Sequence, residues 1–488
     1  MKILFAASEA TPWIKTGGLA DVAGALPLAL RRLGVDARLI LPAYRSVLER
    51  AGEVTVRAEL RLGGLTRGAR LLETAGAEGL PVYLVEAPEL FDRVGHPYLA
   101  SDGSDWSDNG QRFAAFAHGI VELARARPSI GFAPDLVHCN DWQTGLVPAL
   151  LALEAGRPRT LFSIHNLAYQ GQFTRALFDR LNLPELLWSV EGVEYYGAFS
   201  FIKGGLVFAD HLATVSPQYA REIQTPAFGV GLDGLLRARA AQLSGILNGI
   251  DDVAWDPSTD PYLAQRYSLD DPSGKVPCKA ALQRHLGLTV DAAAPLFAHI
   301  GRLVPQKGAD LLLLAMARIL PETAAQLVVL GSGQSALERD LRELAGRYPG
   351  RVAVHIGFDE ALAHQIEAGA DAFVMPSRFE PCGLNQFYSL RYGTPPVVHQ
   401  TGGLADSVYE VPPEAIALGH GNGFVFHSVA ASGLDAALAD ALRRAIGVYT
   451  QPERWRQLMH NGMAGDYSWR RSSVAYRDLY ARIIGPPS

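Results

Sequence analysis

The hydrophobic positions in the second half of the chain alternate between two spacings. Continuous apolar runs, typical of strands buried on both faces, are separated by longer segments in which apolar residues recur at helical intervals. The runs predict strands at 295–301, 326–331, 352–357, 372–377 and 395–400. Between them, the spacing predicts helices at about 306–320, 335–346, 359–369 and 382–392. Strands and helices in this alternating order predict a parallel sheet covered on both faces, as in a Rossmann-like domain.

The first half follows the same plan less regularly. Its predicted strands are 2–8, 37–42, 81–87, 135–140 and 160–166, and a helix is predicted at about 19–33. We therefore expect an α/β protein with two Rossmann-like, doubly wound parallel-sheet domains that face each other across a deep cleft. Ligands of such sheets bind beyond the carboxyl ends of the strands, so the cleft is the expected site. The expected domains are 1–243, 244–455, and a C-terminal helical segment at 456–488 that packs back on the first domain.

Composition and charge exclude several classes of protein. The chain has 488 residues, of which 48% are hydrophobic, and its net charge of −6 argues against a nucleic-acid partner. The three cysteines, Cys139, Cys278 and Cys382, are far apart, which argues against disulfides and a structural zinc site. No apolar run approaches the roughly 18 residues of a membrane-spanning helix, and the segment 2–8 lacks the pattern of a secretion signal. We expect a cytoplasmic protein without a membrane partner.

The hexapeptide TGGLAD occurs twice, at 16–21 and at 401–406. Lys15 precedes the first copy and the uncharged Gln400 precedes the second. Each copy follows a predicted strand and opens a predicted helix, so we interpret the two as opposite walls of one site. The second copy lacks a charge, and its glycine pair is therefore expected to allow close backbone approach or tight packing.

The first copy has the features of an anion-binding loop. Gly17 and Gly18 let a ligand approach the backbone at a helix N-terminus, where negative charge is favoured. Lys15 adds a positive charge, and Asp21 is a further polar candidate for substrate binding. The alternative is a tight strand-to-helix turn without a ligand.

Lysine is rare in this chain, which makes its positions informative. Of the 44 basic residues, six are lysines: Lys2, Lys15, Lys203, Lys275, Lys279 and Lys307. Arg302 and Lys307 lie just beyond a predicted strand, where a forked and a point-like cation together suit a diphosphate. Solvated surface charge is the alternative for this pair.

The segment SRFEPCGL at 377–384 places an acidic residue before a predicted helix. Pro381 suits the first helical position, so the amides of Cys382, Gly383 and Leu384 are expected to face phosphate or sugar oxygens. Glu380 is then expected to lie beside them with its carboxylate in the cleft. Ordinary compensation of the helix dipole is the alternative for Glu380.

Polar residues also follow the predicted strands of the first half. His165 and Asn166 close one strand, and His138 and Asp141 flank the end of another. Such residues tend to line the ligand cleft, and Asn248 is a similar candidate. A purely structural hydrogen-bonding role is the alternative for each of them.

No metal site is predicted. The acidic segment 102–113 was compared with the calcium-binding EF-hand loop, whose twelfth position requires a bidentate glutamate. Counting from Asp105, that position is Phe116. No histidine or cysteine cluster with the spacing of a metal site occurs either.

Several long motifs resemble those of the bacterial glycogen synthase family, which includes the plant starch synthases. In order along the chain they are KTGGLADV, HCNDWQTGLVP, HNLAYQGQF, ADHLATVSPQYAREI, GRLVPQKGADLL, SRFEPCGL and TGGLADSV. The resemblance runs from about residue 1 to about residue 475. Where the family commonly has TQLYGL, this chain has NQFYSL at 385–390.

The resemblance implies a GT-B fold and the retaining transfer of glucose from ADP-glucose to the non-reducing end of an α-1,4-glucan. It implies no metal and no cofactor, with the acceptor on the N-terminal domain and the sugar nucleotide on the C-terminal one. It assigns the reacting groups and the diphosphate to Glu380, His165, Arg302 and Lys307. It assigns substrate binding to Lys15, Gly17, Gly18, Asp141, Asn248, Cys382 and Gly383. Asp21, Asn166 and Leu384 are further substrate-binding candidates from the residue pattern alone.

Two alternative functions remain open at this point. Another retaining GT-B enzyme that uses UDP-glucose would share most of these features. A catalytically silent glucan-binding protein would share the fold, although the intact set of charged residues argues against it. An NAD-dependent oxidoreductase is disfavoured, because the glycine fingerprint and the ribose-binding acid of that class are missing.

Overall fold

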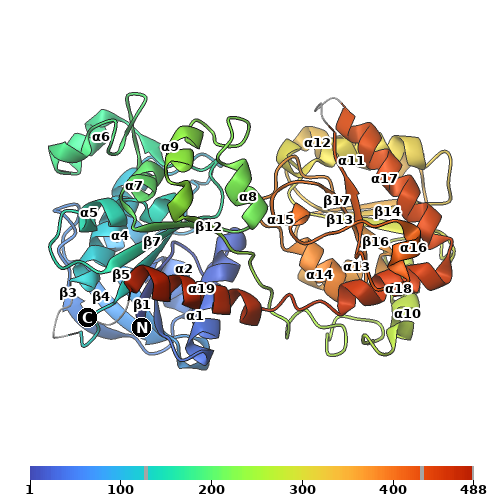
Figure 1. Cartoon of the computed structure of the whole chain (residues 1–488), viewed down its shortest axis with the longest axis horizontal. Coiled ribbons are helices and arrows are strands. Elements are labelled where there is room, and N and C mark those ends of the chain that lie inside the picture. Colours follow the sequence, from blue (N-terminus) through green and yellow to red (C-terminus); the bar gives the residue numbers. More distant parts are fainter. Residues whose placement is uncertain (126–129, 429–432, 486–488) are drawn as a thin grey trace. The chain divides into compact units, whose positions relative to one another are not determined.

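The computed structural model describes residues 1–125, 130–428 and 433–485 (Figure 1). The chain forms two compact units: Met1–Asn248 with Trp469–Ser488, and Gly249–Ser468. The change between units thus falls five residues after the expected boundary at 243. The expected third segment at 456–488 is divided, since its first part stays with the second unit. The segments that leave and re-enter the first unit run side by side, because Ile250 pairs with Ser468 in a parallel bridge.

The first unit is built on a nine-stranded sheet in the order β12-β11-β7-β6-β1-β2-β5-β4-β3. Its strands are β1 (Lys2–Ala6), β2 (Asp36–Pro42), β3 (Thr55–Glu59), β4 (Arg70–Ala75), β5 (Pro81–Glu86), β6 (Leu136–Asn140), β7 (Arg159–Ile164), β11 (His211–Thr214) and β12 (Leu243–Gly245). All five strands predicted in this half are confirmed. The expected parallel arrangement holds from β12 to β5, and the sheet departs from it at one edge, where β4 is antiparallel to β5 and β3 is antiparallel to β4. Only five residues join β4 to β5, too few for the crossover that a parallel pair requires.

The helices of the first unit cover both faces of this sheet (Figure 1). They are α1 (Gly18–Arg32), α2 (Arg45–Arg50), α3 (Pro88–Phe91), α4 (Asn109–Ala124), α5 (Leu146–Leu151), α6 (Arg175–Arg180), α7 (Phe201–Phe208), α8 (Pro217–Glu222), α9 (Asp233–Ala238) and α19 (Trp469–Ile484). A small antiparallel sheet of β8 (Gln172–Phe173), β10 (Ala198–Ser200) and β9 (Glu194–Tyr195) lies apart from the main sheet.

The last helix, α19, completes the first unit. It lies beside α1 (Figure 1). The Tyr480 hydroxyl lies 2.8 Å from His138 Nδ1 in β6, and the Ser472 hydroxyl donates to the Leu247 carbonyl at 2.6 Å. The expected packing of a C-terminal helix on the first unit therefore applies to 469–484, whereas α18 (Pro452–Met463) belongs to the second unit.

The second unit has a six-stranded sheet, parallel throughout, in the order β15-β14-β13-β16-β17-β18. Its strands are β13 (Leu296–Ile300), β14 (Gln326–Gly331), β15 (Val352–Ile356), β16 (Ala372–Met375), β17 (Pro396–His399) and β18 (Phe424–Phe426). Its helices are α10 (Lys275–His285), α11 (Ala309–Ile319), α12 (Ser335–Arg347), α13 (Glu360–Gly369), α14 (Asn385–Arg391), α15 (Gly402–Ala405), α16 (Pro413–Ile416), α17 (Leu434–Tyr449) and α18. The five strands predicted here are confirmed.

Alternate residues of β14 show why this unit is doubly wound. Leu327 and Val329 pack into one buried cluster with residues of α11, α12 and α17. Val328 and Leu330 pack into a second cluster with residues of α10 and α13. A strand with apolar side chains on both faces is stable only when both faces are covered, which is the arrangement that continuous apolar runs predict.

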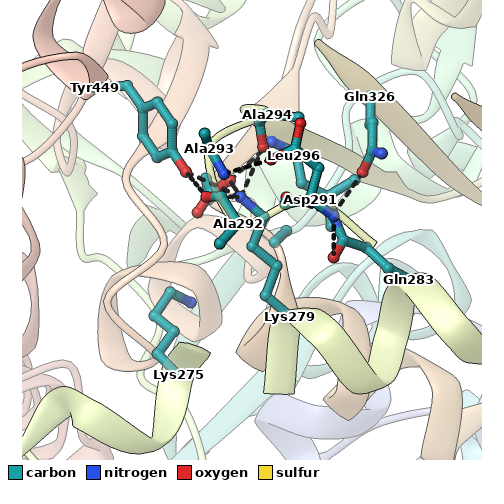
Figure 2. A network of polar contacts seen from close by, with 12 residues as sticks. Lys275, Lys279, Gln283, Asp291, Ala292, Ala293, Ala294, Leu296, Gln326 and Tyr449 are labelled. Carbon is teal, nitrogen blue, oxygen red and sulfur yellow. Dashed lines mark hydrogen bonds and ion pairs between the residues drawn. The ribbon is translucent and has the colours of Figure 1, made fainter. Parts of the chain in front are cut away.

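A buried lysine fixes the start of β13, the strand that leads to the predicted diphosphate site. Lys279 extends from α10 into the loop before β13 (Figure 2). Its ammonium group donates to the carbonyls of Ala292 (3.1 Å) and Ala294 (2.6 Å) and to the Tyr449 hydroxyl (2.9 Å). It also pairs with Asp371 at 2.7 Å. A compact ammonium group with rotatable donors suits this ring of oxygens, so the role of Lys279 is structural.

Candidate active site

The first copy of the repeat forms an open loop beyond the carboxyl end of β1. α1 begins at Gly18, one residue before the predicted start. Gly17 and Gly18 are exposed, and a Cβ atom added at either would meet no other atom within 4 Å. Lys15 Nζ lies 2.8 Å from Asp21 Oδ1 on α1. The loop thus brings four predicted residues together and leaves the backbone of the glycine pair accessible.

A buried carboxylate that the sequence analysis missed holds this loop. Glu9 is 4% exposed and accepts hydrogen bonds from the Thr16 amide (2.5 Å), the Thr16 hydroxyl (2.8 Å) and the Gly17 amide (3.3 Å). Burial raises the pKa of Glu9 against the opposing effect of these hydrogen bonds. The only signal in the sequence was an acidic residue soon after an apolar strand.

Three more predicted residues meet beyond the carboxyl ends of β6 and β7. Asp141 follows β6 with a positive φ of 55°. Its Oδ1 accepts hydrogen bonds from the backbone amides of His165 (2.7 Å) and Asn166 (3.5 Å), which follow β7. His165 Nε2 lies 2.9 Å from Oδ1 of Asn140, a residue that the sequence analysis did not single out. Since β7, β6 and β1 are neighbours, this group belongs to the same edge of the sheet as the glycine loop.

Burial sets the protonation of this group. It raises the pKa of Asp141 to about 7, and the nearby Glu9 charge adds to the effect, while the two amide hydrogen bonds lower it. Burial lowers the pKa of His165 to about 4, so the ring is neutral near pH 7. The side-chain amide of Asn140 donates to two backbone carbonyls, which leaves its oxygen to accept from Nε2–H of His165. Nδ1 of His165 then carries the lone pair and can accept a hydrogen bond from a hydroxyl group.

Asn248 and His138, two other candidates, differ in their hydrogen bonding. Asn248 is buried, and within the part of the chain that the structure describes its Oδ1 has no hydrogen-bond partner. His138, in contrast, lies inside β6 and its two ring nitrogens contact the hydroxyls of Tyr480 (2.8 Å) and Ser163 (2.6 Å). For His138 the structural alternative therefore applies: it is a core histidine that anchors α19.

In the second unit, Lys307 and Glu380 pair at the carboxyl ends of neighbouring strands. Lys307 ends the 3₁₀-helix Pro305–Lys307 before α11, and Glu380 lies in the loop after β16. Lys307 Nζ is 2.6 Å from Glu380 Oε2, to which the Ser377 hydroxyl donates at 2.9 Å. The Glu380 side chain is 7% exposed and that of Lys307 is 24% exposed. The Lys307 ammonium group carries three hydrogens and its positive charge is shared with Glu380, so an anion that binds Lys307 weakens its pairing with Glu380.

Arg302 lies on the exposed loop between β13 and Lys307. Its Nη2 is 3.4 Å from Gln306 Oε1, a weak contact that leaves most of the guanidinium group in solvent. The loop is supported from behind, because Leu303 pairs with Gly333 and a Cβ at Gly333 would lie 2.7 Å from the Leu303 carbonyl carbon. The loop therefore presents Arg302 outward from a fixed backbone.

The helix predicted at 382–392 starts three residues late. α14 spans Asn385–Arg391, because Gly383 has φ +73° and interrupts the helical conformation. The interpretation of Pro381 as the first helical residue was wrong, and Cys382, Gly383 and Leu384 form a turn before the helix. Gln386 Nε2 donates to the carbonyls of Cys382 (3.0 Å) and Gly383 (3.2 Å) and so holds this turn.

An exposed aromatic ring at the same edge was also missed. Phe358 follows β15 and is 86% exposed, the most of any exposed large apolar side chain that the structure describes. The adjoining Gly357 amide donates to the Gly331 carbonyl at 3.0 Å, so the loops after β14 and β15 are tied together. Burial patterns in a sequence do not predict an aromatic ring left in solvent, since such rings are usually buried.

Among the described residues there is neither a metal-binding cluster nor a membrane-spanning helix. No group of three or more histidine, cysteine, aspartate or glutamate side chains there is arranged to hold a metal ion. Of the helices in the described part of the chain, none has the length and apolar content that crossing a bilayer requires.

Known families match both units of the chain. The family described as the starch synthase catalytic domain matches residues 2–238, and the family of glycosyl transferases group 1 matches residues 288–457. A glycogen synthase of Thioalkalivibrio sulfidiphilus is 54% identical over 99% of this chain and 100% of its own length. Glycogen synthase 1 of Methylococcus capsulatus is 51% identical over 99% of this chain and 97% of its own.

Solved structures agree with these matches. The catalytic domain of starch synthase IV from Arabidopsis thaliana, bound to ADP and acarbose, is 33% identical with a TM-score of 0.85 over 99% of each chain. A sucrose-phosphate synthase from Thermosynechococcus elongatus shares the fold at 17% identity, with a TM-score of 0.61 over 99% of this chain and 98% of its own. The chain belongs to the glycogen synthase and starch synthase family of glycosyltransferases, and its two sheet units are those of the GT-B fold.

Proposed function

We propose that this glycosyltransferase acts in the cytoplasm and transfers glucose from ADP-glucose to the 4-hydroxyl at the non-reducing end of an α-1,4-glucan. The anomeric configuration is retained and ADP is released. The observation that carries the proposal is the Lys307–Glu380 pair, held 2.6 Å apart at the carboxyl ends of β13 and β16. It occurs in a chain with 54% identity to a bacterial glycogen synthase over nearly its whole length.

The negative charge that develops on the leaving ADP explains the roles of Arg302 and Lys307. When the bond between glucose and phosphate breaks, negative charge develops on the diphosphate of ADP and positive charge on the sugar. Arg302, exposed on its loop, offers a forked donor, and Lys307 offers a point charge. Their positive charge stabilises the departing diphosphate without a metal ion, and such electrostatic stabilisation is usually the largest contribution to catalysis.

Glu380 changes partner in this proposal. Without donor, its carboxylate neutralises Lys307 and is screened from water. When the diphosphate binds Lys307, Glu380 is left to hydrogen-bond the glucose hydroxyls and to balance the positive charge that develops on the sugar. The turn formed by Cys382, Gly383 and Leu384 begins two residues after Glu380 and lies next to the same sugar.

The candidate groups of the first unit are mostly uncharged or acidic, and Lys15 is the exception. His165 is uncharged near neutral pH because burial lowers its pKa to about 4, so it serves as a hydrogen-bonding group for a sugar hydroxyl. Asp141, Asn166 and Asn248 add oxygen and amide groups that suit the hydroxyl-rich surfaces of sugars. The open Gly17–Gly18 loop with Lys15 suits close approach of the sugar nucleotide.

The donor base has a candidate partner as well. Phe358 presents an exposed ring at the carboxyl edge of the second sheet, and base-on-aromatic stacking is worth about 1–3 kcal/mol. The ADP of the starch synthase IV structure, at 33% identity, supports an adenine nucleotide as the donor's carrier.

One experiment separates this proposal from its alternatives. The purified enzyme is incubated with glycogen and either ADP-glucose or UDP-glucose, labelled in the glucose, and both nucleotide release and label in the glucan are measured. We expect ADP release and label incorporation to rise together, with UDP-glucose far less effective. Preferential incorporation from UDP-glucose would reassign the donor, and nucleotide release without incorporation would exclude glucan elongation.

A further inference from the structure

The two copies of TGGLAD have the same sequence and opposite surroundings. The glycines of the first copy, Gly17 and Gly18, are exposed and have open space where a Cβ would be. The glycines of the second copy, Gly402 and Gly403, are buried and press against another backbone segment. The expectation that the second pair serves close packing is confirmed, and the packing partner is informative.

That partner is the loop that carries Glu380. The Gly403 amide donates to the carbonyls of Glu380 and Pro381, each at 3.1 Å. A Cβ at Gly402 would overlap the Glu380 carbonyl, whose carbon is 2.9 Å away, and Gly402 has a positive φ of 44°. A Cβ at Gly403 would lie 2.5 Å from Cys382 Cα. The start of α15 therefore touches the backbone of three consecutive residues of the loop, 380–382.

We propose that the second TGGLAD copy is a positioning element that sets where the Glu380 carboxylate lies, an inference that rests on the proposed function. Any side chain at Gly403 must push the loop or α15 by several tenths of an ångström, because real Cβ atoms do not approach heavy atoms within about 3.0 Å. Glu380 is fixed at its carboxylate by Lys307 and Ser377. A displaced backbone therefore has to break or stretch one of those contacts.

A second layer of hydrogen bonds locks the same arrangement. The Ser407 hydroxyl donates to the Gly403 carbonyl at 2.6 Å, which holds α15 in its short helical turn. Gln386, fully buried, donates to the Cys382 carbonyl at 3.0 Å and reaches the Ser407 hydroxyl at 3.4 Å. Ser407 and Gln386 thus connect the second TGGLAD copy to the Glu380 loop on its buried side.

The first test is the variant Gly403→Ala. Misplacing a catalytic group by about 1 Å can cost on the order of 100-fold in rate, so we expect kcat to fall by about that factor. The affinity for ADP, measured by calorimetry, should change far less, because Arg302 and Lys307 are not on the displaced loop. A change confined to stability, with kcat per folded molecule unaltered, would overturn the positioning role.

The control is Gly346→Ala. Gly346 is exposed on α12 in the same unit, and a Cβ there would meet nothing within 4 Å. It should retain wild-type kcat and ADP affinity, and equal kcat in Gly403→Ala and Gly346→Ala would refute the proposal.

If Gly403→Ala does not fold, Ser407→Ala decides the question, because it removes one hydrogen bond and adds no bulk. We expect a smaller loss of kcat with ADP affinity retained, and an unchanged kcat would refute the proposal. Failure of the proposed function has a different signature: the wild-type enzyme itself would not release ADP from ADP-glucose with glycogen present.

Discussion

Replacing His364 with glutamine removes the positively charged partner of a buried carboxylate, Asp260, in the second unit. His364 Nδ1 lies 2.7 Å from Asp260 Oδ2, and the two side chains are 5% and 0% exposed. Tyr392 donates to the same oxygen at 2.6 Å. The ring of Trp255 stacks between His364 and Tyr388, with centroid separations of 3.9 Å on both sides. This cluster fastens the segment 249–271 to α13 and α14.

The size of the effect follows from the pKa of His364. Burial lowers this pKa, but the hydrogen bond and charge of Asp260, together with Glu360, raise it to about 9 from the ordinary 6.5. At 1.36 kcal/mol per pKa unit, this difference corresponds to at most about 3 kcal/mol of stabilisation. Glu360 is 52% exposed and its share is screened by water, so we expect about 2 kcal/mol.

The direction of the pH dependence is fixed by the sign of this shift. Because the folded pKa lies above the unfolded one, the stabilisation is complete below about pH 6.5 and is lost as the pH rises through about 9. We expect His364→Gln to lower the free energy of unfolding at pH 6 by about 2 kcal/mol or more, since Asp260 is left without its charged partner. The difference from wild type should narrow by about 2 kcal/mol by pH 10, where the imidazole is uncharged in both the folded and the unfolded protein.

The assay is urea-induced unfolding followed by tryptophan fluorescence at pH 6, 8 and 10. Comparing variant with wild type at each pH cancels the other titrating groups. His355→Gln is the control, because His355 is an exposed histidine on β15 of the same unit. A difference for His364→Gln that is the same at pH 6 and pH 10 would show that the imidazole is not charged in the folded protein.

Four further substitutions test the active site. Glu380→Ala should lower kcat by at least about 100-fold with an unchanged circular dichroism spectrum, and near-normal turnover would remove Glu380 from the mechanism. Lys307→Ala should raise the KM for ADP-glucose and also lower kcat, reducing kcat/KM by about 10-fold or more, because the lost charge both binds the donor and stabilises the departing diphosphate. Unchanged donor kinetics would contradict the diphosphate assignment. Phe358→Ala should raise the same KM by about 5- to 100-fold with little change in kcat, because the stacking of one base is lost. Phe358→Tyr, which keeps the ring, should behave as wild type. Glu9→Gln puts a donor against the Thr16 and Gly17 amides, so hydrogen exchange in 15–18 should accelerate and the KM should rise, and unaltered exchange would contradict the anchoring role.

The sheets were the most predictable part of the fold. Continuous apolar runs such as LVVLG at 327–331 coincide with β14 after its first residue, because a strand buried on both faces is apolar at nearly every position. The antiparallel edge of β3 and β4 was not predicted. Val56 on β3 is 52% exposed, so this strand lacks the apolar pattern on which the prediction depended.

The positions of the candidate residues were predictable where a residue's place along the chain determines its place in the fold. Arg302, Glu380 and His165 lie where the sequence placed them, because each follows the carboxyl end of a parallel strand. Glu9 and Asn140 were missed because their roles depend on which loops lie next to them in space. The start of α14 was misplaced since Pro381 suits a helix start, whereas the left-handed Gly383 leaves no such mark in the sequence.

The docking of α19 has a consequence for the order in which the two units fold during synthesis. His138 in β6 is buried against the Tyr480 hydroxyl, and the two residues are 342 positions apart in the chain. During synthesis, the second unit, which is continuous from Gly249 to Ser468, can finish folding while the first still lacks its last helix. A nascent first unit therefore carries an uncovered apolar surface beside α1 until the ribosome has released nearly the whole chain.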